Sequence, residues 1–381
     1  MKNSFAYFSR ATGQKLISFI SRHKIACIAL LTGGVLWIAS SAVQSRHESI
    51  IPPVVSLLNY TAYFSLLTGL FQLFNKANKL GIARVFVFAI LLLVLEVVCF
   101  FLLGMPTKEH NEFISGDVEP DHIAARLGGV PFGDSVLHSV KYVGQDICFD
   151  VHYTINSECI RVTPGYDSTR NEHALFFGCS IAFGEGLEDN QTLAYNFQQA
   201  SDTYNAYNYA FSGYGTNHML ARLQYQDLSE HVKEENGTAF YVFFWDHIYR
   251  SIGAMSRYTK WGHDAPYYTL ENGKPIRNGS FKNGRFASKI FEEIYQLNTL
   301  KYFDVDFPLK LNDSHYQMLV ALIKESKAIY EKQFKETEFY VLLYPTYEGP
   351  SDWSFVKFKK MLDKENIKYI DLFNVINFGP E

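Results

Sequence analysis

The sequence predicts an α/β protein in two parts: an N-terminal region of three transmembrane helices, residues 1–104, followed by a three-layer α/β/α domain. Two observations carry this prediction. The first hundred residues hold three apolar stretches, each near the ~20 residues that a helix needs to cross a bilayer. From residue 174 onward, short apolar runs typical of buried strands alternate with segments of helical periodicity, which indicates a parallel sheet covered on both faces.

The three apolar stretches are residues 25–43, 50–74 and 82–103. The first is too long for a signal peptide, and no small-residue cleavage site separates it from the second. The second begins with a pair of prolines, which the first turn of a helix tolerates. The third contains Glu96. An ionisable residue within a membrane span has either a functional or a structural role. The other two stretches offer Glu96 no basic partner, which favours the structural role.

The distribution of charged residues predicts an orientation for these helices. Basic residues precede the first stretch and lie between the second and third, whereas acidic residues follow the third. We therefore expect a multi-pass protein of the inner (cytoplasmic) membrane with its C-terminal domain in the periplasm or outside the cell. The polar residues 105–143 predict a linker into that domain. A net charge of −4 argues against nucleic acid as a partner.

The C-terminal domain, residues 144–381, is predicted to open with a β-hairpin that turns at Asn156-Ser157 and keeps Cys148 and Cys159 apart. Five strands of the sheet are expected at residues 174–177, 205–211, 239–245, 338–343 and 368–372. Helices are expected at residues 217–232, 315–334 and 352–362. An insertion at 250–312, with a hairpin signal at Asn272-Gly273, is predicted to cover the substrate; the alternative is a surface insertion without function.

Three candidate site residues follow the first three strands of this sheet. Ser180, Gly213 and Asp246 each stand where a strand ends. The carboxyl ends of parallel strands form one edge, and ligands bind at that edge in open α/β sheets. The sequence therefore predicts one site that contains all three residues.

Ser180 is the candidate nucleophile, because Gly178-Cys179-Ser180 ends a buried strand and Gly184 and Gly186 follow. A serine on a tight strand-to-helix turn is exposed and lies near free backbone N–H groups that stabilise an oxyanion. The Gly-x-Ser-x-Gly elbow of the α/β-hydrolases does not fit, because Ala182 occupies the second glycine position. The alternative is a glycine-rich turn with an incidental serine.

The spacing Gly178-x-Ser180-x-x-x-Gly184-x-Gly186 resembles the first block of the SGNH (GDSL-type) hydrolases, in which Gly-Asp-Ser is the usual form. Gly213, within Ser212-Gly213-Tyr214-Gly215, resembles the second block. This resemblance implies a flavodoxin-like fold and Ser180 as the nucleophile. It also implies backbone N–H groups of Ser180 and Gly213 as oxyanion donors and no metal or organic cofactor.

The sequence departs from the family pattern in two places. Where the third block carries Gly-x-Asn-Asp, His247 stands near the asparagine position, with Asp246 as a less favoured candidate; His247 either donates to the oxyanion or packs structurally. The last block, Asp-x-x-His, is absent after the fifth strand, and His315 lies too far upstream to replace it. We interpret the chain as C-terminally truncated relative to the family, without its catalytic base.

These observations predict a membrane-anchored, exported serine esterase or O-acyltransferase of SGNH type. Its substrate would be an acylated glycan or lipid of the cell envelope, and a membrane partner would supply acyl groups if the protein transfers them. Because the catalytic base of the family is missing, one interpretation is an enzyme that has lost its activity. The alternative is a non-catalytic, membrane-tethered binding or assembly module on the same fold.

Overall fold

The computed structural model describes residues 31–32, 61, 63, 65–66, 68, 79–104, 113–115, 127–143, 146–346, 349–373 and 375. The chain divides into two compact units. One comprises Met1–Pro106 with Leu297–Phe303, and the other comprises Thr107–Gln296 with Asp304–Glu381.

In the first unit, helix α4 (Lys79–Leu103) contacts the short helix α12 (Asn298–Tyr302) through Glu96. The Glu96 carboxylate is buried. It accepts hydrogen bonds from Thr299 N at 2.8 Å, Thr299 Oγ1 at 2.6 Å and Asn298 Nδ2 at 3.1 Å, and also from Asn298 N. The first N–H groups of a helix lack partners within the helix, so this carboxylate completes the first turn of α12. Glu96 therefore has a structural role.

The predicted transmembrane region is not observed. Among the described residues, no helix combines the length and the apolar character needed to span a bilayer. The prediction of a multi-pass inner-membrane protein with an exported domain is therefore wrong. The apolar run at 82–103 does form a helix, but it carries Glu96, whose carboxylate is bonded to the polar first turn of α12. The other two predicted spans, 25–43 and 50–74, lie almost entirely outside the described residues.

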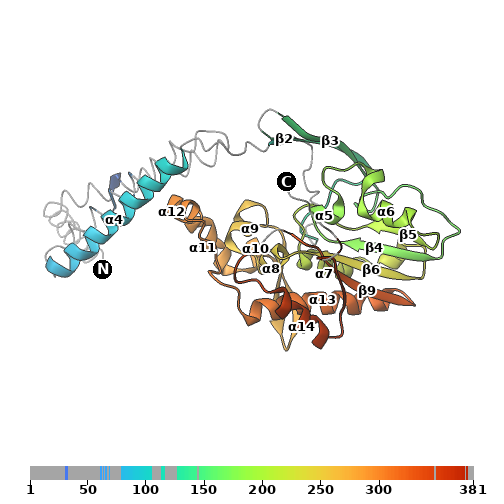
Figure 1. Ribbon diagram of the computed structural model, residues 1–381. Coiled ribbons are helices and arrows are strands. Elements are labelled where there is room, and N and C mark those ends of the chain that lie inside the picture. The colour runs from blue at the N-terminus through green and yellow to red at the C-terminus, as the bar shows by residue number, and fades with distance from the viewer. Residues whose placement is uncertain are drawn as a thin grey trace, which may run out of the picture. The chain divides into compact units, whose positions relative to one another are not determined.

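The second unit is built on a five-stranded parallel sheet (Figure 1). Its strands are β4 (Glu172–Phe177), β5 (Tyr204–Asn208), β6 (Asn236–Phe243), β9 (Thr337–Leu343) and β10 (Lys368–Asp371). They lie in the order β10-β9-β6-β4-β5. Counted along the chain this order is 2-1-3-4-5, the doubly wound order of flavodoxin-like sheets, so the switch point lies between β4 and β6.

Helices α7 (Thr216–Tyr225), α13 (Asp313–Gln333) and α14 (Phe355–Lys364) cover one face of this sheet. Alternate residues of a strand point to opposite faces. Tyr241 and Phe243 of β6 accordingly join the core formed with these helices, whereas Val242 joins the core on the other face. Helix α6 (Leu193–Gln199) packs on that second face through Ala194.

A β-hairpin also covers the second face. Strand β2 (Ser135–Val143) pairs antiparallel with β3 (Asp146–Ile155), and the short strand β1 (Phe113–Ser115) adds to β2. The predicted linker, residues 105–143, thus contains two strands, and β2, not the segment after Asn156, is the main partner of β3. That segment forms a tight turn in which Val162 N donates to Thr154 O at 2.8 Å. Cys148 and Cys159 are not joined by a disulfide.

The segment between β6 and α13 forms a helical and hairpin subdomain. Its elements within the second unit are α8 (Asp246–Ile252), α9 (Met255–Lys260), β7 (Pro266–Glu271), β8 (Lys274–Ser280), α10 (Phe281–Gly284) and α11 (Phe286–Ile294). Strands β7 and β8 turn at Asn272-Gly273, as the sequence predicts. Both residues have positive φ, 52° and 78°, which is the requirement of a two-residue type I′ turn.

Candidate active site

Ser180 is the first residue of the short helix α5 (Ser180–Phe183), three residues beyond the end of β4. Gly178 has φ +153°, and a Cβ there would lie 2.9 Å from Ala182 Cβ and 3.1 Å from Val242 O. Gly184 ends α5 in the left-handed conformation, with φ 82°. The glycines flanking Ser180 are therefore required by the geometry of the turn.

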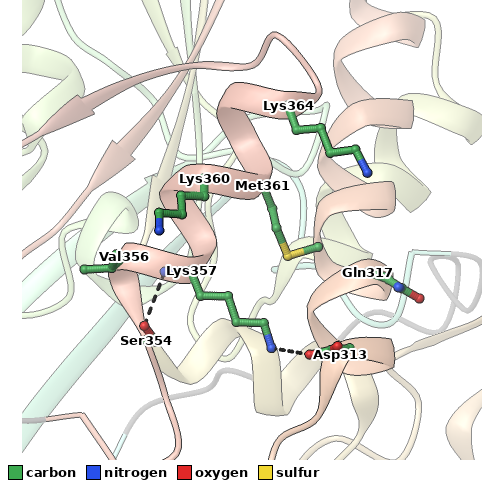
Figure 2. Close-up of a pocket in the computed structure, with 8 residues that line it drawn as sticks. All are labelled: Asp313, Gln317, Ser354, Val356, Lys357, Lys360, Met361 and Lys364. Atoms are coloured by element: carbon green, nitrogen blue, oxygen red, sulfur yellow. Dashed lines mark hydrogen bonds and ion pairs between the residues drawn. The ribbon is translucent and has the colours of Figure 1, made fainter.

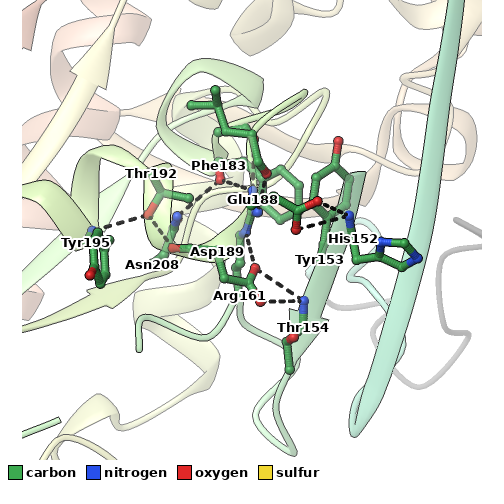
Figure 3. Close-up of polar contacts among 12 residues, drawn as sticks. His152, Tyr153, Thr154, Arg161, Phe183, Glu188, Asp189, Thr192, Tyr195 and Asn208 are labelled. Atoms are coloured by element: carbon green, nitrogen blue, oxygen red, sulfur yellow. Dashed lines mark hydrogen bonds and ion pairs between the residues drawn. The ribbon is translucent and has the colours of Figure 1, made fainter. Parts of the chain in front are cut away.

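A buried arginine holds the backbone that follows Ser180 (Figure 3). Arg161 Nη1 donates to Phe183 O and Gly184 O, both at 2.8 Å, and Nη2 donates to Leu187 O at 2.6 Å. Nε donates to Asp189 Oδ1 at 2.9 Å. Burial lowers the pKa of Arg161, whereas the Asp189 carboxylate raises it. A single guanidinium thus satisfies three carbonyl groups of the loop and one carboxylate.

Further contacts tie this loop to the hairpin and to β5. Gly186 N donates to Tyr153 Oη at 3.0 Å, and the Tyr153 ring lies 4.4 Å from the Arg161 guanidinium carbon. Asn208 Nδ2 donates to Ala182 O at 3.1 Å. Arg161 is not among the site residues predicted from the sequence. Its one signal was a lone charged residue within the apolar run Cys159-Ile160-Arg161-Val162.

The loop after β5 meets the loop after β4. Ser212 Oγ donates to Glu185 Oε2 at 2.7 Å, and Glu185 N donates to Ser180 O at 3.0 Å. Gly213, next to Ser212, has φ +82°. In the part of the chain that the structure describes, the backbone N–H groups of Ser180 and Gly213 donate no hydrogen bond. Both groups remain available to a ligand.

The end of β6 joins the same edge through Arg250. Its Nη1 donates to Tyr214 O at 2.9 Å, and its Nε donates to Asp246 Oδ2 at 2.6 Å. The other carboxylate oxygen of Asp246 accepts from Arg257 Nη2 at 2.7 Å. Asp246 is nearly buried, and two guanidinium groups neutralise it. These contacts make Asp246 part of an ion-pair network that joins α8 to the Gly213 loop.

His247 lies in the core. Its side chain is fully buried, and Nδ1 shares a 2.7 Å hydrogen bond with Tyr241 Oη, which in turn contacts Thr216 Oγ1 at 2.7 Å. The rings of Phe243 and Phe244 pack edge-on against the imidazole. Burial lowers the pKa of His247 well below 6.5, so the ring is neutral. These contacts favour the packing role over the oxyanion role.

No described residue supplies a base to Ser180. The polar contact of Ser180 Oγ within the described ranges is with Cys179 Sγ at 3.9 Å. His315 instead accepts a hydrogen bond from Asn312 N through Nδ1, at 3.2 Å, in the first turn of α13. Among the described residues, the structure thus brings Ser180, Gly213 and Asp246 together at one edge, but it places no histidine within hydrogen-bond reach of the serine hydroxyl. The described part also holds no group of three or more His, Cys, Asp or Glu side chains placed to bind a metal.

The chain has a distant likeness to solved structures. No family model and no curated protein matches the chain. Among solved structures, a mutant of the esterase AlinE4 is similar over 56% of this chain and 86% of that chain, with 12% sequence identity and a TM-score of 0.27. A likeness this distant carries no argument about the site, which therefore rests on its own geometry.

Proposed function

We propose that the carboxyl edge of the sheet is a serine hydrolase site that acts on carboxylic esters, with Ser180 as the nucleophile. The observation that carries the proposal is the convergence of three strand-end loops beside the switch point of the sheet. The Ser212–Glu185 and Arg250–Tyr214 hydrogen bonds join the loops after β4, β5 and β6. Ligands of doubly wound sheets bind at this position.

In the proposed reaction, Ser180 Oγ attacks the ester carbonyl carbon, the alcohol leaves, and water then releases the acyl group as a carboxylic acid. The N–H groups of Ser180 and Gly213, which have no acceptor among the described residues, would donate to the oxyanion of each tetrahedral intermediate. The proton of Ser180 needs an acceptor, and because no described histidine lies within hydrogen-bond reach of this hydroxyl, the acceptor is water. We therefore expect slow turnover. The acylated glycan or lipid predicted from the sequence remains a substrate proposal.

The contacts of Ser180 favour a second candidate function, a non-catalytic binding module. Its hydroxyl contacts a buried thiol, and in the described residues no base orients it. On this alternative the three loops form a ligand site in which Ser180 is a hydrogen-bond donor. The two functions differ in whether Ser180 forms a covalent bond.

Labelling with a fluorophosphonate probe tests the proposal. We expect slow labelling at Ser180, mapped by peptide mass spectrometry, and none in Ser180→Ala. Ser157→Ala, an exposed serine in the turn after β3, is the matched control and should label like the unmodified protein. A correctly folded protein that stays unlabelled would exclude the hydrolase and leave the binding module.

A further inference from the structure

A groove between α13 and α14 lies outside the proposed hydrolase site (Figure 2). Its volume is about 510 Å³, within the range of pockets that hold small organic ligands. Met361 lies between the two helices and, with Val356, supplies the apolar part of the lining. The groove is thus large enough for a molecule bigger than a simple ion.

Three lysines from successive turns of α14 line this groove: Lys357, Lys360 and Lys364. Their positions at i, i+3 and i+7 place them along one side of the helix, spread over roughly 10 Å. Asp313 is the one carboxylate among the lining residues, and Lys357 Nζ binds it at 2.6 Å. The lining therefore carries three positive charges and one negative charge.

Lys360 and Lys364 differ from the lysines around them. Within the described residues neither forms a hydrogen bond or an ion pair, whereas the nearby Lys324, Lys359 and Lys368 each contact a carboxylate. The ammonium groups of Lys360 and Lys364 thus have no carboxylate partner among the described residues, and the same groove offers the apolar side chains of Met361 and Val356. This combination favours a ligand that carries about two negative charges and an apolar group.

We propose that this groove binds a phosphate monoester of a small organic molecule. A phosphate monoester carries about −1.5 to −2 charges at pH 7, which matches the excess charge of the lining, and lysine is a common phosphate-binding residue. The side chains of Lys360 and Lys364 point away from each other in the structure (Figure 2), so they would turn toward the phosphate on binding, and the organic group would contact Met361. This binding site is independent of Ser180 and of the proposed hydrolase function.

Isothermal titration of the full chain with phenyl phosphate tests the proposal, with inorganic phosphate and phenol as the two halves of the probe. We expect phenyl phosphate to bind about tenfold more tightly than either half. Its affinity should fall with added salt, because exposed charge pairs are screened. Equal affinity for inorganic phosphate, or no measurable binding of phenyl phosphate, would overturn the proposed ligand class.

Charge-removing variants locate the site. Lys360→Gln with Lys364→Gln should weaken phenyl phosphate binding about tenfold, because exposed ion pairs contribute a factor of ~1.5–5 each. Lys359→Gln is the control: it removes one positive charge from the same helix, at a residue that does not line the groove, and should leave the affinity unchanged. Circular dichroism verifies folding of each variant. An unchanged affinity in the double variant, or an equal loss in Lys359→Gln, would contradict binding in this groove.

Discussion

At the residue scale, the turn that carries Ser180 depends on Arg161. The guanidinium makes four hydrogen bonds to the loop and lies over the rings of Tyr153 and Phe183, at 4.4 Å and 4.9 Å from their centroids. A buried charge is costly unless every donor is satisfied. Here the fork geometry of arginine satisfies three carbonyl groups and a carboxylate at once.

Replacing Arg161 tests this role. Arg161→Met should lower the free energy of unfolding by about 3–5 kcal/mol, because Asp189 and three carbonyl groups lose the guanidinium as a donor in a buried region. Arg161→Lys should restore little of this loss, since one ammonium group cannot reproduce the planar fork. Urea denaturation followed by circular dichroism measures both. A loss below about 1 kcal/mol in Arg161→Met would show that the loop is held by its other contacts.

At the scale of the element, β4, the turn and α5 form one strand-to-helix unit whose shape excludes a side chain at Gly178. A Cβ at Gly178 would be strained by the positive φ and would also overlap Ala182 and Val242 O. At Gly273, in the β7–β8 turn, φ is also positive, +78°, but a Cβ would meet nothing within 4 Å. A substitution at Gly273 therefore measures backbone strain alone, whereas a substitution at Gly178 measures backbone strain and steric overlap together.

We expect Gly178→Ala to destabilise the protein by about 2–4 kcal/mol, because it combines the strain of an unfavourable φ with overpacking. Gly273→Ala should cost only about 1 kcal/mol, from strain alone. Thermal unfolding of the two variants side by side measures the difference. Equal losses would mean that the Ala182 and Val242 contacts relax without cost. Gly178→Ala should also abolish fluorophosphonate labelling of Ser180.

At the scale of the whole molecule, the second unit folds around buried neutral histidines. His173 in β4 is fully buried, with Nδ1 2.9 Å from Glu234 O and Nε2 2.8 Å from Tyr330 Oη. Burial lowers the pKa of His173 to about 4 and that of His218, in α7, to about 3. The unfolded chain binds protons at these positions more readily than the folded protein.

This difference predicts acid sensitivity. Because the pKa of His173 falls from about 6.5 in the unfolded chain to about 4 in the folded protein, its contribution to stability is complete above pH 6.5 and is lost as the pH falls toward 4. Between pH 7.5 and 5, the loss from His173 is about 2 kcal/mol. Urea denaturation at both pH values should show a smaller difference in His173→Gln than in the unmodified protein. An identical difference would exclude His173 as a source of the acid sensitivity.

Several features were predictable from the sequence alone because they depend on local patterns. Apolar runs of strand length alternating with helical periodicity predicted the parallel sheet. Strand ends placed Ser180, Gly213 and Asp246 at one edge. Asn272-Gly273 predicted a turn, because these residues adopt positive φ at low cost. Each of these signals lies within a few consecutive residues.

Other features were decided by contacts between distant segments. Hydrophobicity predicted a membrane span at 82–103, but hydropathy does not report that the Glu96 carboxylate completes the first turn of α12. The polar composition of residues 105–143 gave no indication of β2. This strand pairs with β3, and the hairpin they form covers one face of the sheet. The burial of His247 against Tyr241, and the four bonds of Arg161 to the Ser180 loop, likewise exist only once the chain has folded. The sequence determined which chemical groups reach the site, whereas tertiary packing decided which of them are bonded, buried or left available to a ligand.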